Sequence, residues 1–207
     1  MKLRSFSSCK RGFTLIEILV VMAIIAILVS IAYPIITSKL VEAKRTESRK
    51  QCVDIAEGIK NFYQEYNTYP VKNEGSIADS GSGTTIRTTE RDPNDLITIL
   101  FGKEKSENRI NEKKIQYITG SIVETKVNGI YRRGDSYGYY DPWGEAYYVE
   151  ITHDVDGEGL NDPCATGTNK STDQSVIVWG TGPDKEGSRG TADNTKDNVF
   201  SYKSGSK

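Results

Sequence analysis

The chain has 207 residues, 27% of them charged and 36% hydrophobic, and a formal net charge of -1 at pH 7. This length leaves room for one compact domain beside an N-terminal leader and a long helix. Nucleic-acid binding requires a basic face, which this net charge does not suggest, so no nucleic acid is expected as a partner. The single histidine, His153, comes without a nucleophile motif or a phosphate-binding glycine loop, and we therefore expect no enzyme.

An apolar run of membrane-spanning length follows Lys10, Arg11 and Gly12. Glu17 is the only charged residue in this run, and a carboxylate in hydrocarbon is costly unless it is paired, so this acid is a functional candidate. A secretory signal has a shorter apolar region, of roughly 7–15 residues, that ends in small residues. A cut between Gly12 and Phe13 would instead precede the apolar run and leave it on the mature protein.

The segment Gly12–Glu17, with the sequence GFTLIE, resembles the type III signal of the type IV pilin-like family, which includes type IV pilins and type II secretion pseudopilins. The resemblance implies a leader of residues 1–12, which prepilin peptidase removes after Gly12, and N-methylation of Phe13. It also implies a filament of many copies, in which Glu17 faces the amine of a neighbouring Phe13. That pairing would set the axial register, because a mispacked copy would leave a buried charge unpaired. A plain signal anchor with a chance glutamate is the alternative.

The charges before the apolar run predict its orientation. Four basic residues and no acid precede it: Lys2, Arg4, Lys10 and Arg11. The N-terminus should therefore stay cytoplasmic, with the rest of the chain outside the cytoplasmic membrane. Together with this orientation, the resemblance implies a single-pass protein of the bacterial inner membrane with a periplasmic globular part. Loss of the leader removes these four charges and changes the formal net charge from -1 to -5 on the mature form.

A single long helix is expected to continue beyond the membrane. Residues 13–36 are predicted to be the transmembrane and filament-core helix, residues 37–69 its amphipathic continuation, and residues 70–207 the globular domain. Pro34 should kink the helix because it lacks an N–H group, and the resemblance assigns this proline a part in assembly. Apolar residues recur every three or four positions between Cys52 and Tyr66, which we interpret as a face that covers a small sheet.

The second half of the chain predicts loops, one short helix and a few strands. Residues 71–92 are interpreted as an exposed loop, residues 95–101 as a short helix capped by Asn94 or Asp95, and residues 114–118 as the start of a strand. Two clearer strands, residues 147–151 and 175–179, are expected to pair antiparallel across the apolar face of the helix.

The C-terminal part carries a second resemblance. Asp-Pro-Trp-Gly at residues 141–144 is a turn by composition, and Gly-Thr-Gly-Pro-Asp follows the last predicted strand. This arrangement resembles the C-terminal region of the major, G-type pseudopilin. The predicted fold class is therefore α+β, in the type IV pilin-like fold: a long N-terminal helix packed on a small antiparallel sheet with extended C-terminal loops.

Two acidic loops are candidates for a calcium site, and the first spans residues 180–202. In major pseudopilins the matching loop folds around calcium, so the resemblance implies Asp184 and Asp197 as acidic ligands. Asn198 stands where a second acid is common, and Asp193 is a candidate to supply the missing charge. Calcium accepts six to eight oxygen ligands in flexible geometry, so two carboxylates with carbonyl groups suffice. A hydrogen-bonded turn without metal is the alternative.

The first loop departs from the family pattern at Lys185, which replaces a glycine, and in its greater length. The second loop, residues 154–159, has acids and a glycine at the spacing that begins an EF-hand. Its twelfth position is Ala165 instead of the bidentate glutamate of such loops. We therefore interpret the second loop as a surface turn.

The chain has three cysteines, and Cys9 would leave with the leader. Cys52 and Cys164 remain in a compartment where disulfides form. A Cys52–Cys164 bridge is one interpretation, and a buried Cys52 with a solvent-exposed Cys164 is the other.

The predicted function is that of a structural filament subunit, most like the major pseudopilin of a type II secretion system. The resemblance implies as partners further copies of the chain, prepilin peptidase, minor pseudopilins, the inner-membrane assembly platform and the cytoplasmic membrane. In this interpretation a periplasmic or surface filament drives protein export, with energy from a separate ATPase. One alternative is an extracellular type IV pilus subunit for adhesion, motility or DNA uptake. Another is a pilin-anchored binding protein that does not polymerise.

Overall fold

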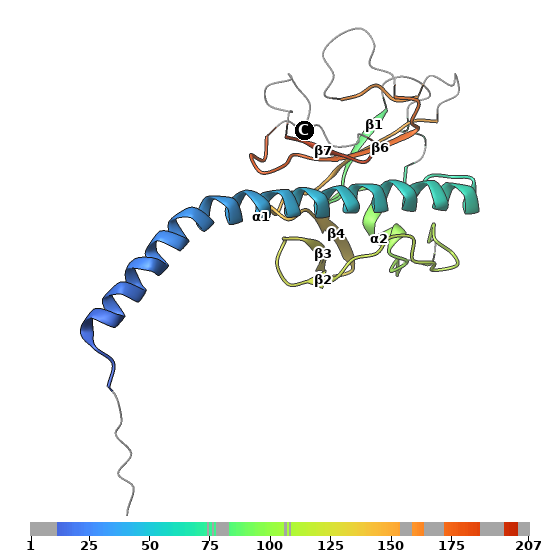
Figure 1. Ribbon diagram of the computed structural model, residues 1–207. Coiled ribbons are helices and arrows are strands. Elements are labelled where there is room, and N and C mark those ends of the chain that lie inside the picture. The colour runs from blue at the N-terminus through green and yellow to red at the C-terminus, as the bar shows by residue number, and fades with distance from the viewer. Residues whose placement is uncertain are drawn as a thin grey trace, which may run out of the picture. The chain divides into compact units, whose positions relative to one another are not determined.

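The computed structural model describes residues 12–73, 75, 77, 83–105, 107, 109–153, 159–163, 172–186 and 197–202. The chain forms two compact units, Met1–Glu42 and Ala43–Lys207. The helix α1 (Leu15–Tyr66) belongs to both units, and all other helices and strands of the described residues belong to the second unit (Figure 1).

The helix α1 has 52 residues and stays helical through Pro34. The hydroxyl of Thr37 donates to the carbonyl oxygens of Pro34, at 3.0 Å, and Tyr33, at 3.3 Å. The proline therefore does not end the helix, and the expected kink remains a prediction. The helix ends at Tyr66, three residues before the predicted boundary at residue 69.

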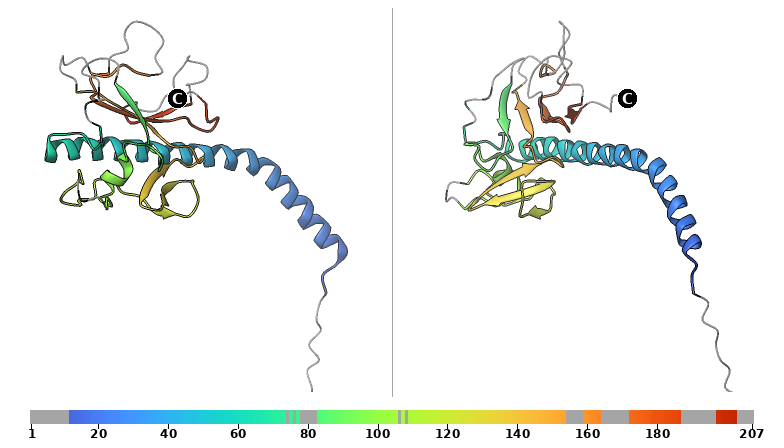
Figure 2. Two further views of the ribbon diagram at one scale, coloured as in Figure 1. Left: turned by 180° about the vertical axis from the view of Figure 1, so that it is seen from behind. Right: turned by 90° about the vertical axis from the view of Figure 1, so that its left-hand side faces the viewer.

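A four-stranded antiparallel sheet lies on one side of the second half of α1 (Figures 1 and 2). Its strands, in spatial order, are β1 (Thr84–Arg87), β5 (Tyr148–Ile151), β6 (Val176–Gly180) and β7 (Val199–Phe200). Val149 pairs with Val178 in the antiparallel β5–β6 ladder, so the pairing predicted for these two segments is confirmed. The strand β1 corrects the prediction of a loop over residues 71–92, because its pairing with β5 overrides a loop-like local composition.

A second sheet and a short helix lie on the other side of α1 (Figure 2). The strands β2 (Ile122–Val123) and β3 (Gly129–Arg133) are parallel, and β3 forms a hairpin with β4 (Ser136–Tyr140). The helix α2 (Leu96–Leu100) is buried along its whole length, in agreement with the short helix predicted there. Residues 114–118 form no strand, and this prediction was wrong: the Tyr117 N–H donates instead to the Leu100 carbonyl at 2.8 Å.

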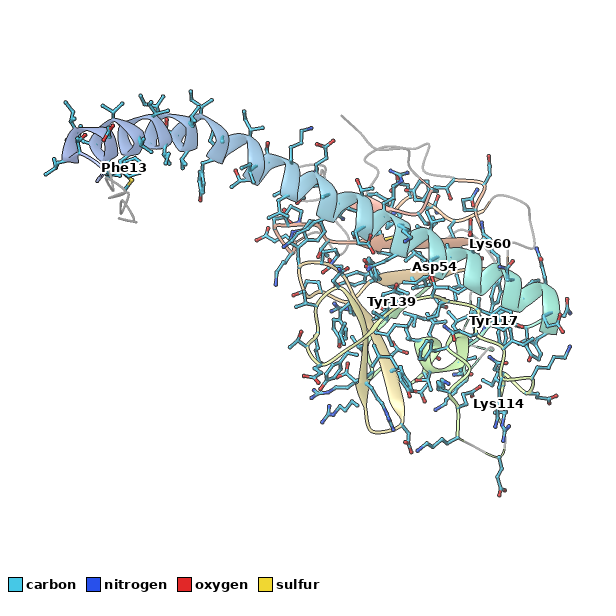
Figure 3. The ribbon with its side chains drawn as sticks, turned by 60° about the horizontal axis from the view of Figure 1, so that its bottom comes forward. Phe13, Asp54, Lys60, Lys114, Tyr117 and Tyr139 are labelled. Carbon is cyan, nitrogen blue, oxygen red and sulfur yellow. The ribbon has the colours of Figure 1, made fainter. Side chains whose placement is uncertain are left out.

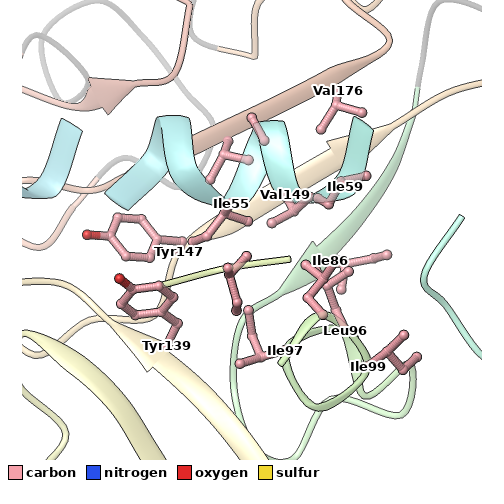
Figure 4. Packing of buried hydrophobic residues seen from close by; sticks show 14 of the residues in the cluster. Ile55, Ile59, Ile86, Leu96, Ile97, Ile99, Tyr139, Tyr147, Val149 and Val176 are labelled. Atoms are coloured by element: carbon pink, nitrogen blue, oxygen red, sulfur yellow. The ribbon is translucent and has the colours of Figure 1, made fainter. Parts of the chain in front are cut away.

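The apolar face of α1 supplies the centre of the core. Cys52, Ile55, Ile59 and Phe62 are fully buried in a cluster with residues of β1, β5, β6 and α2. Figure 4 shows Ile55 and Ile59 in this cluster. This confirms the interpretation of the three-and-four spacing as a packing face. A smaller cluster contains Leu160, Ile177, Trp179 and Phe200. Alternate side chains of β6 thus belong to two different clusters, since successive residues of a strand point to opposite faces.

Candidate assembly and cation sites

The first functional candidate is the apolar N-terminal part of α1. Phe13 is 81% exposed, and no large apolar side chain from there to Val41 is buried (Figure 3). By length and composition α1 could cross a membrane, and none of its apolar window is buried within the protein. A soluble protein rarely exposes so long an apolar surface, so this segment requires lipid or other protein around it.

Glu17 is held by the start of its own helix. Its Oε2 accepts hydrogen bonds from the backbone N–H and the hydroxyl of Thr14, both at 2.7 Å. The Glu17 N–H in turn donates to the Thr14 hydroxyl at 3.3 Å. Because α1 begins at Leu15, this reciprocal pair is a capping box with threonine at the N-cap and glutamate at the third helical position. The T-x-x-E pattern of residues 14–17 is a signal for such a cap, although only a partner on a neighbouring subunit was predicted for Glu17.

The predicted cleavage point lies just before this cap. Gly12 and Phe13 are both exposed and precede the helix, so the peptide bond between them is open to solvent. A Cβ atom at Gly12 would meet no atom within 4 Å. The single chain therefore gives no steric reason for glycine at this position, and any requirement for it would have to come from a processing enzyme.

The second functional candidate is the C-terminal loop, where the structure brings two of the predicted ligands together. Burial raises the pKa of Asp197, and the neighbouring Asp184 carboxylate raises it further through its charge and a hydrogen bond. Gly182 has a φ of +78°, and a Cβ atom there would come within 2.5 Å of the Asp197 carbonyl oxygen. Glycine is thus required for the close approach of the two ends of this loop.

Two buried oxygens in this region have no hydrogen-bond partner among the described residues, Asp197 Oδ1 and Thr181 Oγ1. Such orphaned acceptors are costly unless a partner such as a cation satisfies them. Within the same described ranges, no group of three or more histidine, cysteine, aspartate or glutamate side chains is placed to hold a metal ion. A cation here would therefore depend on two carboxylates together with hydroxyl, amide and backbone oxygens.

Several other candidates receive less support or lie outside the described residues. Asn198 follows Asp197 directly, whereas Asp193 and the acids of the second loop, residues 154–158, lie outside the described residues. Cys52 lies in the core and forms no disulfide with another described residue; its Sγ lies 3.6 Å from the Val199 carbonyl oxygen, and burial raises the pKa of its thiol. Cys164 also lies outside the described residues, so the predicted bridge stays a prediction.

A polar groove of about 280 Å³ lies between α1 and residues 119–129. Its lining includes carboxylates, a lysine and hydroxyl groups but no histidine or cysteine. Asp54 accepts from the Thr119 N–H at 2.8 Å, and the Gln51 amide donates to Asn128 Oδ1 at 2.8 Å. These bonds make the groove a hydrogen-bonded joint between the helix and the segments around the second sheet.

Comparison with known proteins supports the N-terminal assignment. Residues 7–33 match the family model described as the prokaryotic N-terminal methylation motif. A fimbrial protein of Dichelobacter nodosus is 28% identical over 150 residues, which are 62% of this chain and 88% of that protein. The type IV major pilin protein PilA of Myxococcus xanthus (strain DK1622) is 35% identical over 69 residues, which are 33% of this chain and 31% of that protein. No solved structure matches the chain.

The matched motif covers the exposed cleavage point, the Thr14–Glu17 cap and most of the apolar segment. The longer fimbrial match extends the similarity into the second unit. The α+β architecture, a long N-terminal helix with a small antiparallel sheet, agrees with the fold predicted above. In this motif, this fold and these relatives, the chain is similar to type IV pilins, and the likeness points to a membrane-anchored structural subunit of a filament.

Proposed function

We propose that the chain polymerises with copies of itself into a helical filament through the apolar part of α1, after prepilin peptidase has cut between Gly12 and Phe13. The observation that carries this proposal is the apolar surface from Phe13 to Val41, which no described residue of the chain buries. Methylation of the Phe13 amine would keep a cation at the new N-terminus, opposite the acid of a neighbouring copy. In this assignment Glu17 exchanges its bond to Thr14 for that amine.

The relatives favour a surface type IV pilus as the filament. Two fimbrial proteins of Dichelobacter nodosus, 28% and 29% identical, each match over 88% of their length. We therefore propose an extracellular pilus subunit first. The globular unit would lie outside the cytoplasmic membrane before assembly, with the N-terminus in the cytoplasm.

A type II secretion pseudopilus is the second candidate, and a specific observation favours it. The close pair of Asp184 and Asp197, with a buried unsatisfied oxygen on Asp197, suits a cation-binding C-terminal loop of the kind that the sequence predicts for a major pseudopilin. In this assignment calcium is held by Asp184 and Asp197, with Thr181 and Asn198 as further oxygen donors. When bound, calcium would neutralise the two carboxylates and fix the loop. Minor pseudopilins and the inner-membrane assembly platform would then be the partners.

Fractionation of cells that express the chain at its normal level distinguishes the two filaments. The cells are sheared, and the sheared and membrane fractions are probed with antibody and imaged. Long filaments in the sheared fraction support the surface pilus. Protein confined to the membrane fraction, with loss of protein export in a deletion strain, supports the pseudopilus. Protein in the membrane without filaments or an export defect would contradict both and leave a pilin-anchored binding protein.

A further inference from the structure

Charge is distributed very unevenly along this chain. Residues 37–50 contain five basic and two acidic side chains, whereas residues 51–207 contain 18 basic and 25 acidic ones. A segment of net charge +3 thus stands between the apolar part of α1 and a remainder of net charge -7. The positive charge is concentrated in four residues that we call the basic collar: Lys44, Arg45, Arg49 and Lys50.

The basic collar is not neutralised by the fold. Lys39 pairs with Glu42 at 2.8 Å, but no ion pair within the described residues includes a residue of the collar. Arg45 and Lys50 are exposed, and Lys44 and Arg49 are half-buried. Four cations are therefore available to an external partner. Their Cα atoms occupy two turns of one regular helix, about 9 Å along its axis, which is close to the Debye length at physiological ionic strength.

The position of the collar in the sequence points to a partner. It begins three residues after Val41, the last large apolar side chain that α1 exposes. The apolar surface of α1 continues past the predicted span, residues 13–36, as far as Val41, and a tilted helix accommodates so long a stretch in the bilayer. Basic residues that follow this stretch then lie at the depth of the lipid headgroups, where an anionic surface attracts each of them. The acidic remainder of the chain would be repelled by the same surface, so attraction through the collar would offset that repulsion.

We propose that the basic collar binds the phosphate groups of anionic lipids in the leaflet on the side of the globular unit. This inference rests on the membrane anchoring proposed above, but it does not require that the chain polymerises. The collar would hold an unassembled subunit at a fixed depth in the membrane. Extraction into a filament would then have to release these lipids, so anionic lipid would compete with assembly.

Lipid selection by the full mature chain tests the inference. The chain is reconstituted in nanodiscs of phosphatidylglycerol and phosphatidylcholine, and the lipids retained on the protein are counted by native mass spectrometry. We expect phosphatidylglycerol to be enriched at least threefold over its bulk share, a rough figure from the attraction per basic residue. The variant K44Q/R45Q/R49Q/K50Q should retain the bulk ratio. The matched control K103Q/K105Q/K113Q/K114Q removes four exposed charges of the globular unit and should select lipid as the wild type does.

Three other outcomes of these experiments would contradict the inference. If the wild type retains lipids at the bulk ratio, or the collar variant keeps the enrichment, the collar does not bind anionic lipid. If lipid selection is absent and the collar variant fails to form filaments, the partner of the collar is an acidic surface on a second copy. If the wild type selects phosphatidylglycerol but never forms filaments, the proposed function is contradicted and the lipid inference stands. Flotation of every variant with vesicles confirms that each is still anchored.

Discussion

At the scale of single residues, the proposed filament requires Glu17 to bind two partners in turn. In the single chain its carboxylate caps its own helix through Thr14, so it is not a bare charge waiting for a neighbour. A filament contact with the amine of Phe13 must therefore be stronger than a cap, whose loss costs about 1 kcal/mol. A buried ion pair can meet this condition where water is excluded, because removal of one partner leaves an uncompensated charge.

Two substitutions separate the cap from the charge. Glu17→Gln keeps a side chain that can complete a capping box but removes the charge, whereas Thr14→Ala removes the hydroxyl and keeps the charge. We expect Glu17→Gln to lower the filament yield in the sheared fraction at least tenfold, and Thr14→Ala to lower it much less. Both variants should remain in the membrane. Equal losses from both would show that the cap itself, and not the charge, is needed for assembly.

Glu90 is a buried acid that the sequence did not single out. Its side chain is 1% exposed, Lys126 Nζ lies 2.6 Å from one carboxylate oxygen, and the Tyr140 hydroxyl donates to the other. Burial alone would raise the pKa of Glu90, but the hydrogen bonds from Lys126 and Tyr140 lower it from 4.5 to about 2. Lys126 also lies over the rings of Tyr131 and Tyr140, so this cluster holds the loop between β2 and β3.

The lowered pKa of Glu90 predicts a pH dependence of stability. Because the pKa is lower in the folded state, the stabilisation is complete above the unfolded value of about 4.5 and is lost as the pH falls towards 2. Glu90→Gln should cost on the order of 3 kcal/mol at neutral pH and should flatten the unfolding profile between pH 4.5 and 2. Thermal unfolding of the detergent-solubilised chain, followed by tryptophan fluorescence, measures this. Glu112→Gln, at an exposed acid, is the control, and the same acid sensitivity in Glu90→Gln would refute the assignment.

At the scale of elements, the sequence predicted what local patterns can encode. The apolar run and the three-and-four spacing predicted α1. The alternation of residues 147–151 predicted β5, and the apolar residues 175–179 predicted β6. The hairpin of β3 and β4 was missed, because Gly-Ile-Tyr-Arg-Arg and Ser-Tyr-Gly-Tyr-Tyr do not alternate clearly between apolar and polar residues. The same distinction applies to the candidate sites. The predicted cleavage motif is a local pattern that the sequence reveals, whereas the approach of Asp184 to Asp197 depends on how the loop closes.

Gly58 is a helix residue whose role only tertiary packing reveals. A Cβ atom there would lie 2.7 Å from Ile118 Cγ2 and 2.9 Å from the Tyr117 carbonyl oxygen, so glycine lets this segment cross α1. Alanine is ordinarily better than glycine in a helix by about 1 kcal/mol. We nevertheless expect Gly58→Ala to destabilise the globular unit by about 1–3 kcal/mol. The control Asn61→Ala, at an exposed position of the same helix, should be neutral or slightly stabilising, and a stabilised Gly58→Ala would contradict the crossing.

Cation binding by the C-terminal loop can be tested by comparing melting temperatures in calcium and in chelator. If calcium bridges Asp184 and Asp197, its addition should raise the melting temperature of the wild type by several degrees, since a ligand stabilises the state that binds it. Asp184→Ala should abolish that response, and in chelator it should melt close to the wild type, because it removes one of two repelling carboxylates. Asp135→Ala, at the exposed β3–β4 turn, should respond to calcium as the wild type does. If Asp184→Ala loses the same stability in calcium and in chelator, Asp184 does not bind calcium.

At the scale of the whole molecule, membrane orientation depends on a narrow balance. Lys2, Arg4, Lys10 and Arg11 precede the apolar run, while residues 37–50 after it contain five basic residues. The positive-inside rule counts basic residues near the two ends of a span, and acids contribute little. The leader therefore has no excess of basic residues over the segment on the other side, and small changes in either should shift the orientation.

Removal of distant leader charges tests this balance without altering the residues beside the cut. We expect the double variant K2Q/R4Q to reduce the fraction of correctly oriented chains from nearly all to about half, because residues 37–50 then exceed the leader by three basic residues instead of one. Adding K44Q/R45Q to the same chain should restore the orientation, since it removes two positive charges from the other end. Protease accessibility of the globular part in spheroplasts measures the fraction, and leader cleavage gives an independent readout. If K2Q/R4Q is oriented as the wild type, the orientation is set by translocation of the folded region and not by the flanking charges.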